Sequence, residues 1–176
     1  MPPGLSRLAL EGSAVRLRPF AEADLPTLLA ILSEPEVGRW WGPYDEPKLR
    51  GELSDPKVTA WVILADDTDT PSGLVVAREE PDPDYRHAEL DIFLTPLHHG
   101  RGLGADALRT ALHHLFEEQG HHRAVIVPAA DNERAIRSYA RVGFKPIGVM
   151  RRSERAPDGR WHDELAMDLL AHEWGP

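Results

Sequence analysis

One uninterrupted stretch in the second half of the chain constrains the fold more than any other. His87–Leu94 alternates, with Glu89 and Asp91 on one side and apolar residues on the other, as a half-buried strand does. Apolar side chains then recur at helical spacing over residues 102–119. Ala124–Val127 is continuously apolar, which is typical of a strand covered on both faces. A strand, a helix and a covered strand in succession predict a sheet with helices packed against it.

The first third of the chain predicts less regular structure. Four leucines between residues 25 and 32 recur at helical spacing and predict one helix. Residues 35–57 contain four prolines and three glycines, so we expect an irregular segment there, with one short helix over residues 46–53. Residues 1–12 read as a flexible tail.

The order of elements predicts a single domain. Turn residues predict hairpins over residues 59–77 and 146–169, and Asn132 is placed to cap a helix that Gly143 ends. The resulting order of about seven strands and about four helices is that of a mixed-sheet α/β or α+β domain. We place this domain at residues 13–174.

Composition excludes several classes of function. The chain has 176 residues, enough for one domain with a sizeable core, and no cysteine, which excludes disulfides and thiolate chemistry. A formal net charge of −9 disfavours nucleic acid or an anionic membrane as a partner and favours a cationic substrate. The sequence shows neither a secretory signal nor an apolar run of the roughly 18–20 residues that a membrane span needs. We therefore expect a cytoplasmic protein.

A glycine-rich turn joins the alternating strand to its helix. Glycines at positions 100, 102 and 104 let consecutive amides converge, and the helix that follows adds its own unpaired amides and the positive end of its dipole. This arrangement predicts a phosphate or diphosphate cradle. The turn lacks the lysine of a nucleotide-hydrolase loop. It fits a dinucleotide fingerprint formally, but the next strand ends in Val127-Pro128, where that fingerprint expects an acid.

Two motifs resemble those of the GNAT family of N-acetyltransferases. The family's phosphate loop reads [QR]-x-x-G-x-[GA], and residues 99–104 match it except that His99 stands in place of Gln or Arg. The family's later motif, N-x-x-A-x-x-x-Y-x-x-x-G-F, is matched completely from Asn132 to Phe144. The order of elements over about residues 14–170 also agrees with the family's.

The resemblance implies an acyl-CoA N-acyltransferase fold with a mostly antiparallel sheet, and acetyl-CoA as donor. Its diphosphate would lie on the turn, its pantetheine arm along the end of the 88–94 strand, and a backbone N–H near Phe93 or Leu94 would polarise the thioester. Loss of the usual side chain at His99 then implies altered affinity rather than lost binding. The implied donor-binding residues are Ile92, Phe93, Leu94, His99, Gly100, Arg101, Gly102, Leu103, Gly104, Ala105, Asn132 and Tyr139.

The chemistry of amine acetylation asks for a base and an acid. A protonated amine must lose a proton before it attacks, and the site-facing carboxylates Glu89 and Asp91 are the candidate acceptors; we favour Asp91, which lies closer to the thioester. A phenol can protonate the leaving thiolate, and Tyr139 carries one. The alternative is a core tyrosine, but the complete motif around it favours the acid role. The nine histidines show no metal-ligand spacing, so we expect no metal.

The acceptor is less well defined by the sequence. Trp40, Trp41 and Tyr44 either wall an acceptor pocket or cap the core. The acidic loop 79–84, with Glu79 and Asp82, is either a second substrate contact or a solvated turn.

Within the family, residues 37–42 and 90–94 resemble aminoglycoside 6'-N-acetyltransferases, which implies a polycationic acceptor and an antibiotic-resistance role. Val127 stands where those enzymes place an acid. Residues 15–20 and 158–161 equally resemble N-terminal acetyltransferases of ribosomal proteins. A non-catalytic acyl-CoA sensor stays a third alternative, and pairing as a homodimer is common among relatives.

Overall fold

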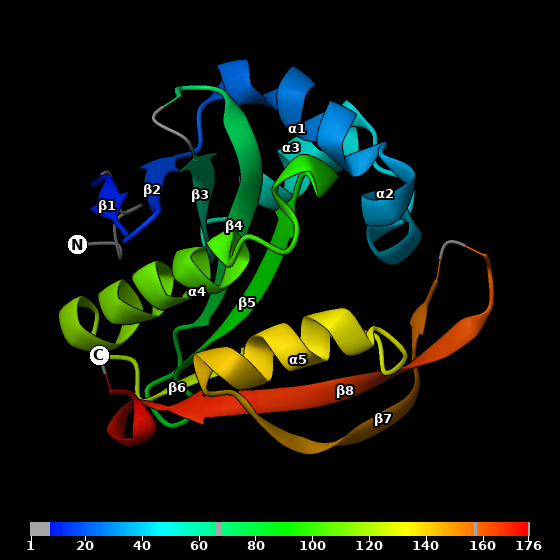
Figure 1. Cartoon of the computed structure of the whole chain (residues 1–176). Coiled ribbons are helices and arrows are strands. Elements are labelled where there is room, and N and C mark those ends of the chain that lie inside the picture. Colours follow the sequence, from blue (N-terminus) through cyan, green and yellow to red (C-terminus); the bar gives the residue numbers. More distant parts are fainter. Residues whose placement is uncertain (1–7, 66–67, 157, 176) are drawn as a thin grey trace.

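The computed structural model describes residues 8–65, 68–156 and 158–175. Five α-helices and an eight-stranded sheet make up this described part, in which several short 3-10 turns and one π-helical turn also occur (Figure 1). In chain order the elements are β1 (Leu10–Glu11), β2 (Val15–Pro19), α1 (Leu25–Leu32), α2 (Pro35–Trp41), α3 (Glu46–Leu53), β3 (Val58–Ala65), β4 (Pro71–Glu80), β5 (His87–Leu94), α4 (Leu103–His113), β6 (Arg123–Ile126), α5 (Glu133–Val142), β7 (Lys145–Arg155) and β8 (Trp161–Leu170).

The sheet has the strand order β1-β2-β3-β4-β5-β6-β8-β7, and all its neighbours are antiparallel except β5 and β6. This parallel pair needs a crossover, which α4 provides. Its pairing covers only Ala88–Leu90 of β5 and Ala124–Ile126 of β6. Beyond Leu90, β5 continues for four residues with β4 alone as its ladder partner. The two strands therefore splay apart in the middle of the sheet.

Each face of the sheet has its own core. On one face α1, α2 and α3 pack through residues such as Leu28, Val37 and Leu49 against the strands. On the other face α4 and α5 lie across the strands, and α4 contributes the buried residues Leu108 and Leu112 (Figure 1). Alternation along β5 divides its side chains between these two cores, as the sequence predicts: Phe93 joins the first, and Leu90 joins the second.

The structure corrects three boundaries. Residues 35–41, expected to be irregular, form α2, because Pro35 occupies the first turn, where its missing N–H costs nothing, and Gly42 ends the helix at φ +78°. Residues 10–11, expected in the tail, form β1 against β2. β4 runs on through Glu80 and takes in two residues of the expected acidic loop. Residues 1–7 of the expected tail, 66–67 of the first hairpin turn and 157 of the second lie outside the described residues.

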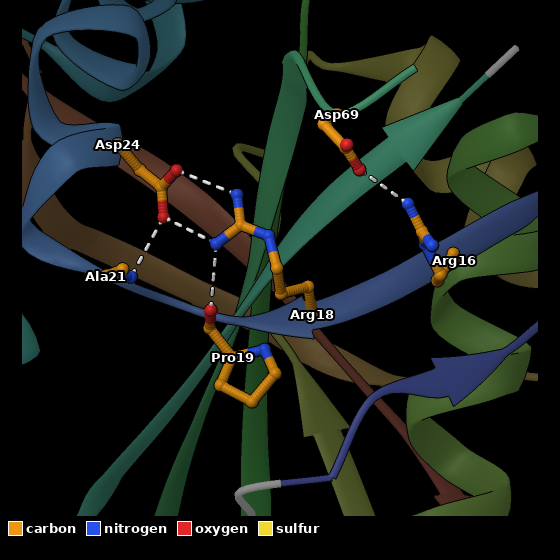
Figure 2. Close-up of polar contacts among 6 residues, drawn as sticks. All are labelled: Arg16, Arg18, Pro19, Ala21, Asp24 and Asp69. Atoms are coloured by element: carbon orange, nitrogen blue, oxygen red, sulfur yellow. Dashed lines mark hydrogen bonds and ion pairs between the residues drawn. The ribbon is translucent and has the colours of Figure 1, made fainter. Parts of the chain in front are cut away.

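A buried ion pair joins β2 to the start of the helical layer (Figure 2). Both guanidinium Nη atoms of Arg18 donate to the carboxylate of Asp24, at 2.8 and 2.9 Å, and the N–H of Ala21 donates to the same carboxylate at 2.8 Å. Burial acts to raise the pKa of Asp24, but these donors outweigh it and hold the pKa below the ordinary value. The nearby pair of Arg16 and Asp69 resembles it in chemistry, yet the side chain of Asp69 is 92% exposed against 7% for Asp24.

We expect Asp24→Asn to lower the free energy of unfolding by about 1–2 kcal/mol at pH 7, since a charge-assisted pair is lost at a buried position. A depressed native pKa contributes stability above the unfolded-state value of about 3.9, and that stability is lost as the pH falls through the native value. The deficit of the variant should therefore shrink below about pH 4 in urea unfolding curves. Asp69→Asn is the matched control and should change nothing measurable; equal losses in both variants would contradict the assignment.

Candidate active site

A pocket of about 220 Å³ lies where β5 and β6 splay apart. It receives residues from both faces of the sheet, because α2 approaches from one side and α5 from the other. The splay is thus a gap through the sheet rather than a depression on one face. Its lining residues are Trp40, Trp41, Tyr44, Arg78, Glu89, Asp91, Ile92, Ile126, Val127, Pro128, Ala129, Asn132, Tyr139, Glu154 and Glu164.

Eight of the donor- and acceptor-site residues predicted from the sequence come together in this pocket. They are Trp40, Trp41, Tyr44, Glu89, Asp91, Ile92, Asn132 and Tyr139. Sequence reasoning missed Arg78, Glu154 and Glu164. Their placement depends on strand pairing: Arg78 lies opposite Glu89 in the β4–β5 ladder, and Glu154 reaches the pocket from the β7–β8 hairpin. Arg78 is the first charged residue after a buried apolar run on β4, and this is the signal that could have indicated the first of these.

Arg78 is the centre of a polar network at the acceptor side. Its Nη1 donates to Asp91 Oδ2 at 2.5 Å, and its Nη2 lies 3.8 Å from Glu52 Oε2. The hydroxyl of Tyr44 in turn donates to the carboxylate of Glu52 at 3.0 Å. The guanidinium therefore sits between carboxylates of β5 and α3, where it partly neutralises a strongly acidic pocket.

Two of the pocket acids, Glu89 and Glu154, have a raised pKa and are shifted toward the neutral form. Burial raises the pKa of Glu89, and the charge of Asp91 raises it further. Burial likewise raises the pKa of Glu154, with Glu164 and then Asp91 adding to the effect. Four carboxylates and one guanidinium thus line a single pocket, and the unfavourable proximity of the carboxylates would be relieved by a cationic ligand.

Tyr139 lies on the α5 side of the gap, where its ring makes a tilted contact with Phe144 at 6.4 Å between centroids. Burial raises the pKa of its phenol well above the ordinary value, and the charge of Asp91 adds to this. The phenol therefore stays protonated at neutral pH, so it can donate a proton to a developing anion but cannot act as a resting base.

The aromatic wall on the other side is anchored in the core. The indole of Trp41 meets the ring of Phe93 edge-on at 5.0 Å and that of Tyr44 at 6.1 Å. The guanidinium of Arg39 covers the ring of Trp40 at 4.6 Å. Trp41 therefore packs against the core and also lines the pocket.

Main-chain groups at the end of β5 face the gap. The N–H of Thr95 donates to the carbonyl of Ser72 on the β4 side, which makes Leu94 and Gly73 a non-hydrogen-bonded pair of the ladder. Alternation then turns the peptide groups of Phe93 toward β4 and those of Ile92 and Leu94 toward the gap. The carbonyl of Leu94 accepts a hydrogen bond from His99 Nε2 at 2.9 Å. Of the two N–H groups expected to polarise a thioester, that of Phe93 is turned toward β4, and that of Leu94 faces the gap.

The glycine-rich turn has the conformation that an anion cradle requires. Gly100 and Gly102 adopt φ of +76° and +79°, which side-chain-bearing residues rarely adopt, and a Cβ added at either would meet nothing within 4 Å. The first intrahelical hydrogen bond at this end of α4 runs from the N–H of Asp106 to the carbonyl of Gly102. The amides of residues 103–105 therefore precede the α-helical ladder and are free to bind an anion. Residues His99 to Ala105 thus fit a diphosphate.

Two residues expected to bind the acceptor lie elsewhere. Glu79 is on the α4 face of β4, where its carboxylate contacts Nε2 of the buried His121 at 2.9 Å and the hydroxyl of Thr59 at 3.3 Å. Asp82 lies in an exposed loop and accepts from the N–H of Asp84 at 2.9 Å. Neither lines the pocket. Alternation explains Glu79, since it follows Arg78 and so points to the opposite face.

Nothing in the described part of the chain forms a group of three or more His, Asp or Glu side chains suited to a metal ion. Among its helices, none is long and apolar enough to cross a membrane.

Comparison with known proteins decides the family. A family model described as an acetyltransferase (GNAT) domain matches residues 14–145. The chain belongs to the GNAT acetyltransferase family. The family and fold that the sequence motifs predict are therefore confirmed, and the chain is an N-acetyltransferase.

Similar GNAT proteins act on different amines. Spermidine N(1)-acetyltransferase of Escherichia coli K12 is 25% identical over 168 residues, covering 92% of this chain and 88% of that protein. Aminoglycoside N(6')-acetyltransferase type 1 of Klebsiella pneumoniae is 26% identical over 166 residues, covering 83% and 79%. The crystal structure of spermidine N-acetyltransferase from Vibrio cholerae in complex with CoA and spermine shares the fold, with a TM-score of 0.80, 23% identity and coverage of 92% and 98%.

Placement of Glu79 outside the pocket generates a prediction. We expect Glu79→Ala to lower the free energy of unfolding by about 2 kcal/mol, because buried His121 loses its partner, while kcat and KM stay unchanged. The contact with His121 holds the pKa of Glu79 below its ordinary value of about 4.3, so this loss of stability should be present at pH 7 and fade below about pH 4. Unfolding curves and steady-state kinetics on one preparation check both parts.

Asp82→Ala is the control and should alter neither stability nor kinetics. A raised KM for the amine in Glu79→Ala, with unchanged stability, would restore the substrate-binding role that the sequence suggests.

Proposed function

We propose that this enzyme transfers the acetyl group of acetyl-CoA to a primary amine of a small polycationic molecule. The observation that carries the proposal is the pocket in the sheet gap, with four carboxylates and one guanidinium around it. A polyvalent cation would relieve the repulsion among these carboxylates, whereas an anionic or neutral acceptor would not.

The volume of the pocket limits the size of the acceptor group that can enter it. At about 220 Å³ the pocket is smaller than the roughly 300–1,000 Å³ of sites that enclose drug-sized ligands. A linear polyamine can enter it, and so can a single amino-sugar ring whose remaining rings stay outside against Trp40 and Tyr44. These two acceptor types match the names of the two relatives described above. An aminoglycoside-like acceptor, which the sequence resemblance favours, thus stays in the proposal beside a polyamine.

The donor half of the site follows from the turn and the strand end. The amides of residues 103–105 would bind the diphosphate, and the pantetheine arm would lie along Ile92–Leu94, where peptide groups without a strand partner face the gap. The N–H of Leu94 would polarise the thioester carbonyl. This places the acyl carbon in the gap, with the acidic pocket on one side and Tyr139 on the other.

Transfer then needs three proton movements. The ammonium group loses one proton to a pocket carboxylate, and the nitrogen attacks the thioester carbon. As the carbon–sulfur bond breaks, the phenol of Tyr139 protonates the departing sulfur, and the second proton that the nitrogen loses on becoming an amide restores the phenol. The environments of the two candidate bases separate their roles. Asp91, ion-paired to Arg78, is suited to bind the incoming ammonium in that cation's place. Glu89, whose pKa is raised, is the better proton acceptor.

The proposal is tested by thiol release from acetyl-CoA against a panel of spermidine, spermine, kanamycin-type sugars and peptides with free N-termini. We expect turnover with at least one polycation and none with the peptides, which tests the N-terminal acetyltransferase alternative. Tyr139→Phe should bind CoA as wild type does but lose about tenfold to hundredfold in kcat. Donor binding without turnover on any amine would instead favour a sensor, and turnover on peptides alone would overturn the acidic-pocket argument.

The division of labour between the two acids gives a separate prediction. Glu89→Gln should lower kcat by about a hundredfold or more and abolish the acidic limb of the pH profile of kcat/KM. Asp91→Asn should chiefly raise the KM of the amine, with that limb retained. Full pH profiles of both variants with the best panel substrate check this. The reverse pattern would return the role of base to Asp91, as first expected from its position on the strand.

A further inference from the structure

His99 connects three elements around the donor turn. Its Nε2 lies 2.9 Å from the carbonyl oxygen of Leu94 at the end of β5, and its Nδ1 lies 2.8 Å from Nη1 of Arg134 in the first turn of α5. A carbonyl can only accept and a guanidinium can only donate, so these contacts fix one state of the ring. Nε2 carries the proton, Nδ1 is an acceptor, and the imidazole is neutral.

The surroundings of His99 favour the same state. Burial lowers the pKa of the imidazole, and the positive charge of Arg134 lowers it too. The hydrogen bond to Leu94 and the carboxylates of Glu34 and Glu36, from the start of α2, oppose this and are outweighed. Both the contacts and the charges therefore keep the ring neutral at pH 7.

Among the residues that the structure describes, the half-buried His99, and no fully buried side chain, holds the guanidinium of Arg134. The Arg134 side chain is exposed, and its Nη1 donates to Nδ1 of His99 at 2.8 Å. Its Nη2 lies 3.4 Å from Nε2, which carries the proton donated to Leu94 and so accepts nothing from Arg134. A solvent-exposed arginine ordinarily samples many rotamers, which is favoured by entropy. The hydrogen bond to Nδ1 of the neutral His99 ring restricts the guanidinium of Arg134 to one position. That place is beside the glycine-rich turn and near Tyr139, whose phenol senses the charge of Arg134.

We propose that Arg134 is a second diphosphate-binding residue of the donor site and that His99 is the positioning residue that holds it there. This rests on the proposed acetyl-CoA donor. The backbone amides of residues 103–105 carry no formal charge. The guanidinium can donate two further hydrogen bonds to the diphosphate, and these are charge-assisted. The same His99 ring fixes the carbonyl of Leu94, whose own N–H faces the gap, so one side chain orders both ends of the donor cleft.

The arrangement makes donor binding depend on pH. Protonation of His99 turns Nδ1 into a donor and places a second positive charge beside Arg134, which releases the guanidinium. Because the pKa of His99 lies below the ordinary value of about 6.5, the contact persists through neutrality and is lost only as the pH falls below that value. Donor affinity should fall over the same range.

The experiment measures CoA binding by titration calorimetry and donor kcat/KM for wild type and four variants. Arg134→Met should weaken CoA about tenfold, the usual effect of losing a charge-assisted contact. It should weaken 3'-dephospho-CoA equally, and leave kcat/KM for S-acetylpantetheine, which lacks the diphosphate, unchanged. A loss seen with CoA but not with 3'-dephospho-CoA would place Arg134 on the 3'-phosphate and overturn the proposal.

The role of His99 is separated by its own variants. His99→Leu should weaken CoA at pH 8 and make a further Arg134→Met change nearly without effect, since His99 acts through Arg134. His99→Gln offers an uncharged acceptor and donor, so it should restore affinity at pH 8 and keep it when the pH is lowered to 5.5. The phosphates of CoA also titrate, but their effect on affinity is the same for every variant. It cancels when the pH dependence of each variant is compared with that of Arg134→Met.

Two outcomes separate this inference from the proposed function. Wild type that binds neither CoA nor 3'-dephospho-CoA would remove the acetyl-CoA donor and the inference with it. Wild type that binds CoA while Arg134→Met binds it equally well, or additive losses in the double variant, would overturn the inference and leave the proposed function standing.

Discussion

The early end of the β5–β6 ladder is the constraint on which the site depends. Pairing stops at Leu90 and Ile126, so the peptide groups of Ile92 and Leu94 turn toward a gap in the sheet instead of a neighbouring strand. Buried peptide groups need hydrogen-bond partners, and here the side chain of His99 donates to the carbonyl of Leu94. A ligand that runs along β5 as an extra strand can satisfy the rest, and this makes the gap a binding site by construction.

The gap also joins two chemically different faces. Glu89 and Asp91 point to the face covered by α1–α3, whereas Ile92 and Leu94 belong with the face covered by α4 and α5. An acidic pocket with aromatic walls therefore lies on one side, and the glycine-rich turn with Tyr139 on the other. A cationic acceptor and an anionic donor can approach from opposite faces without passing each other, and they meet only where the strands have parted.

The features predicted from the sequence are those that local patterns determine. The alternation of β5, the positive-φ glycines of the turn and the Asn132 cap, which accepts from the N–H of Ala135 at 3.2 Å, all depend on neighbours a few residues away. Helix α2 was missed because its stability comes from burying Val37 against the sheet, a contact that the local sequence does not contain. The pocket residues Arg78, Glu154 and Glu164 were missed because register and a distant hairpin decide their positions.

The acids show how far alternation alone can go. Glu79 and Glu89 are the same residue type on adjacent strands, yet one pairs with buried His121 on the α4 face and the other lines the pocket. Arg78 pairs with Glu89 in the ladder, so it shares the pocket face, and Glu79 must then point away. A shift of one residue in the β4–β5 register would exchange the faces of Arg78 and Glu79. It would remove the guanidinium from Asp91 and add a carboxylate to the pocket. The charge of the pocket is therefore fixed by strand register as much as by the identity of its acids.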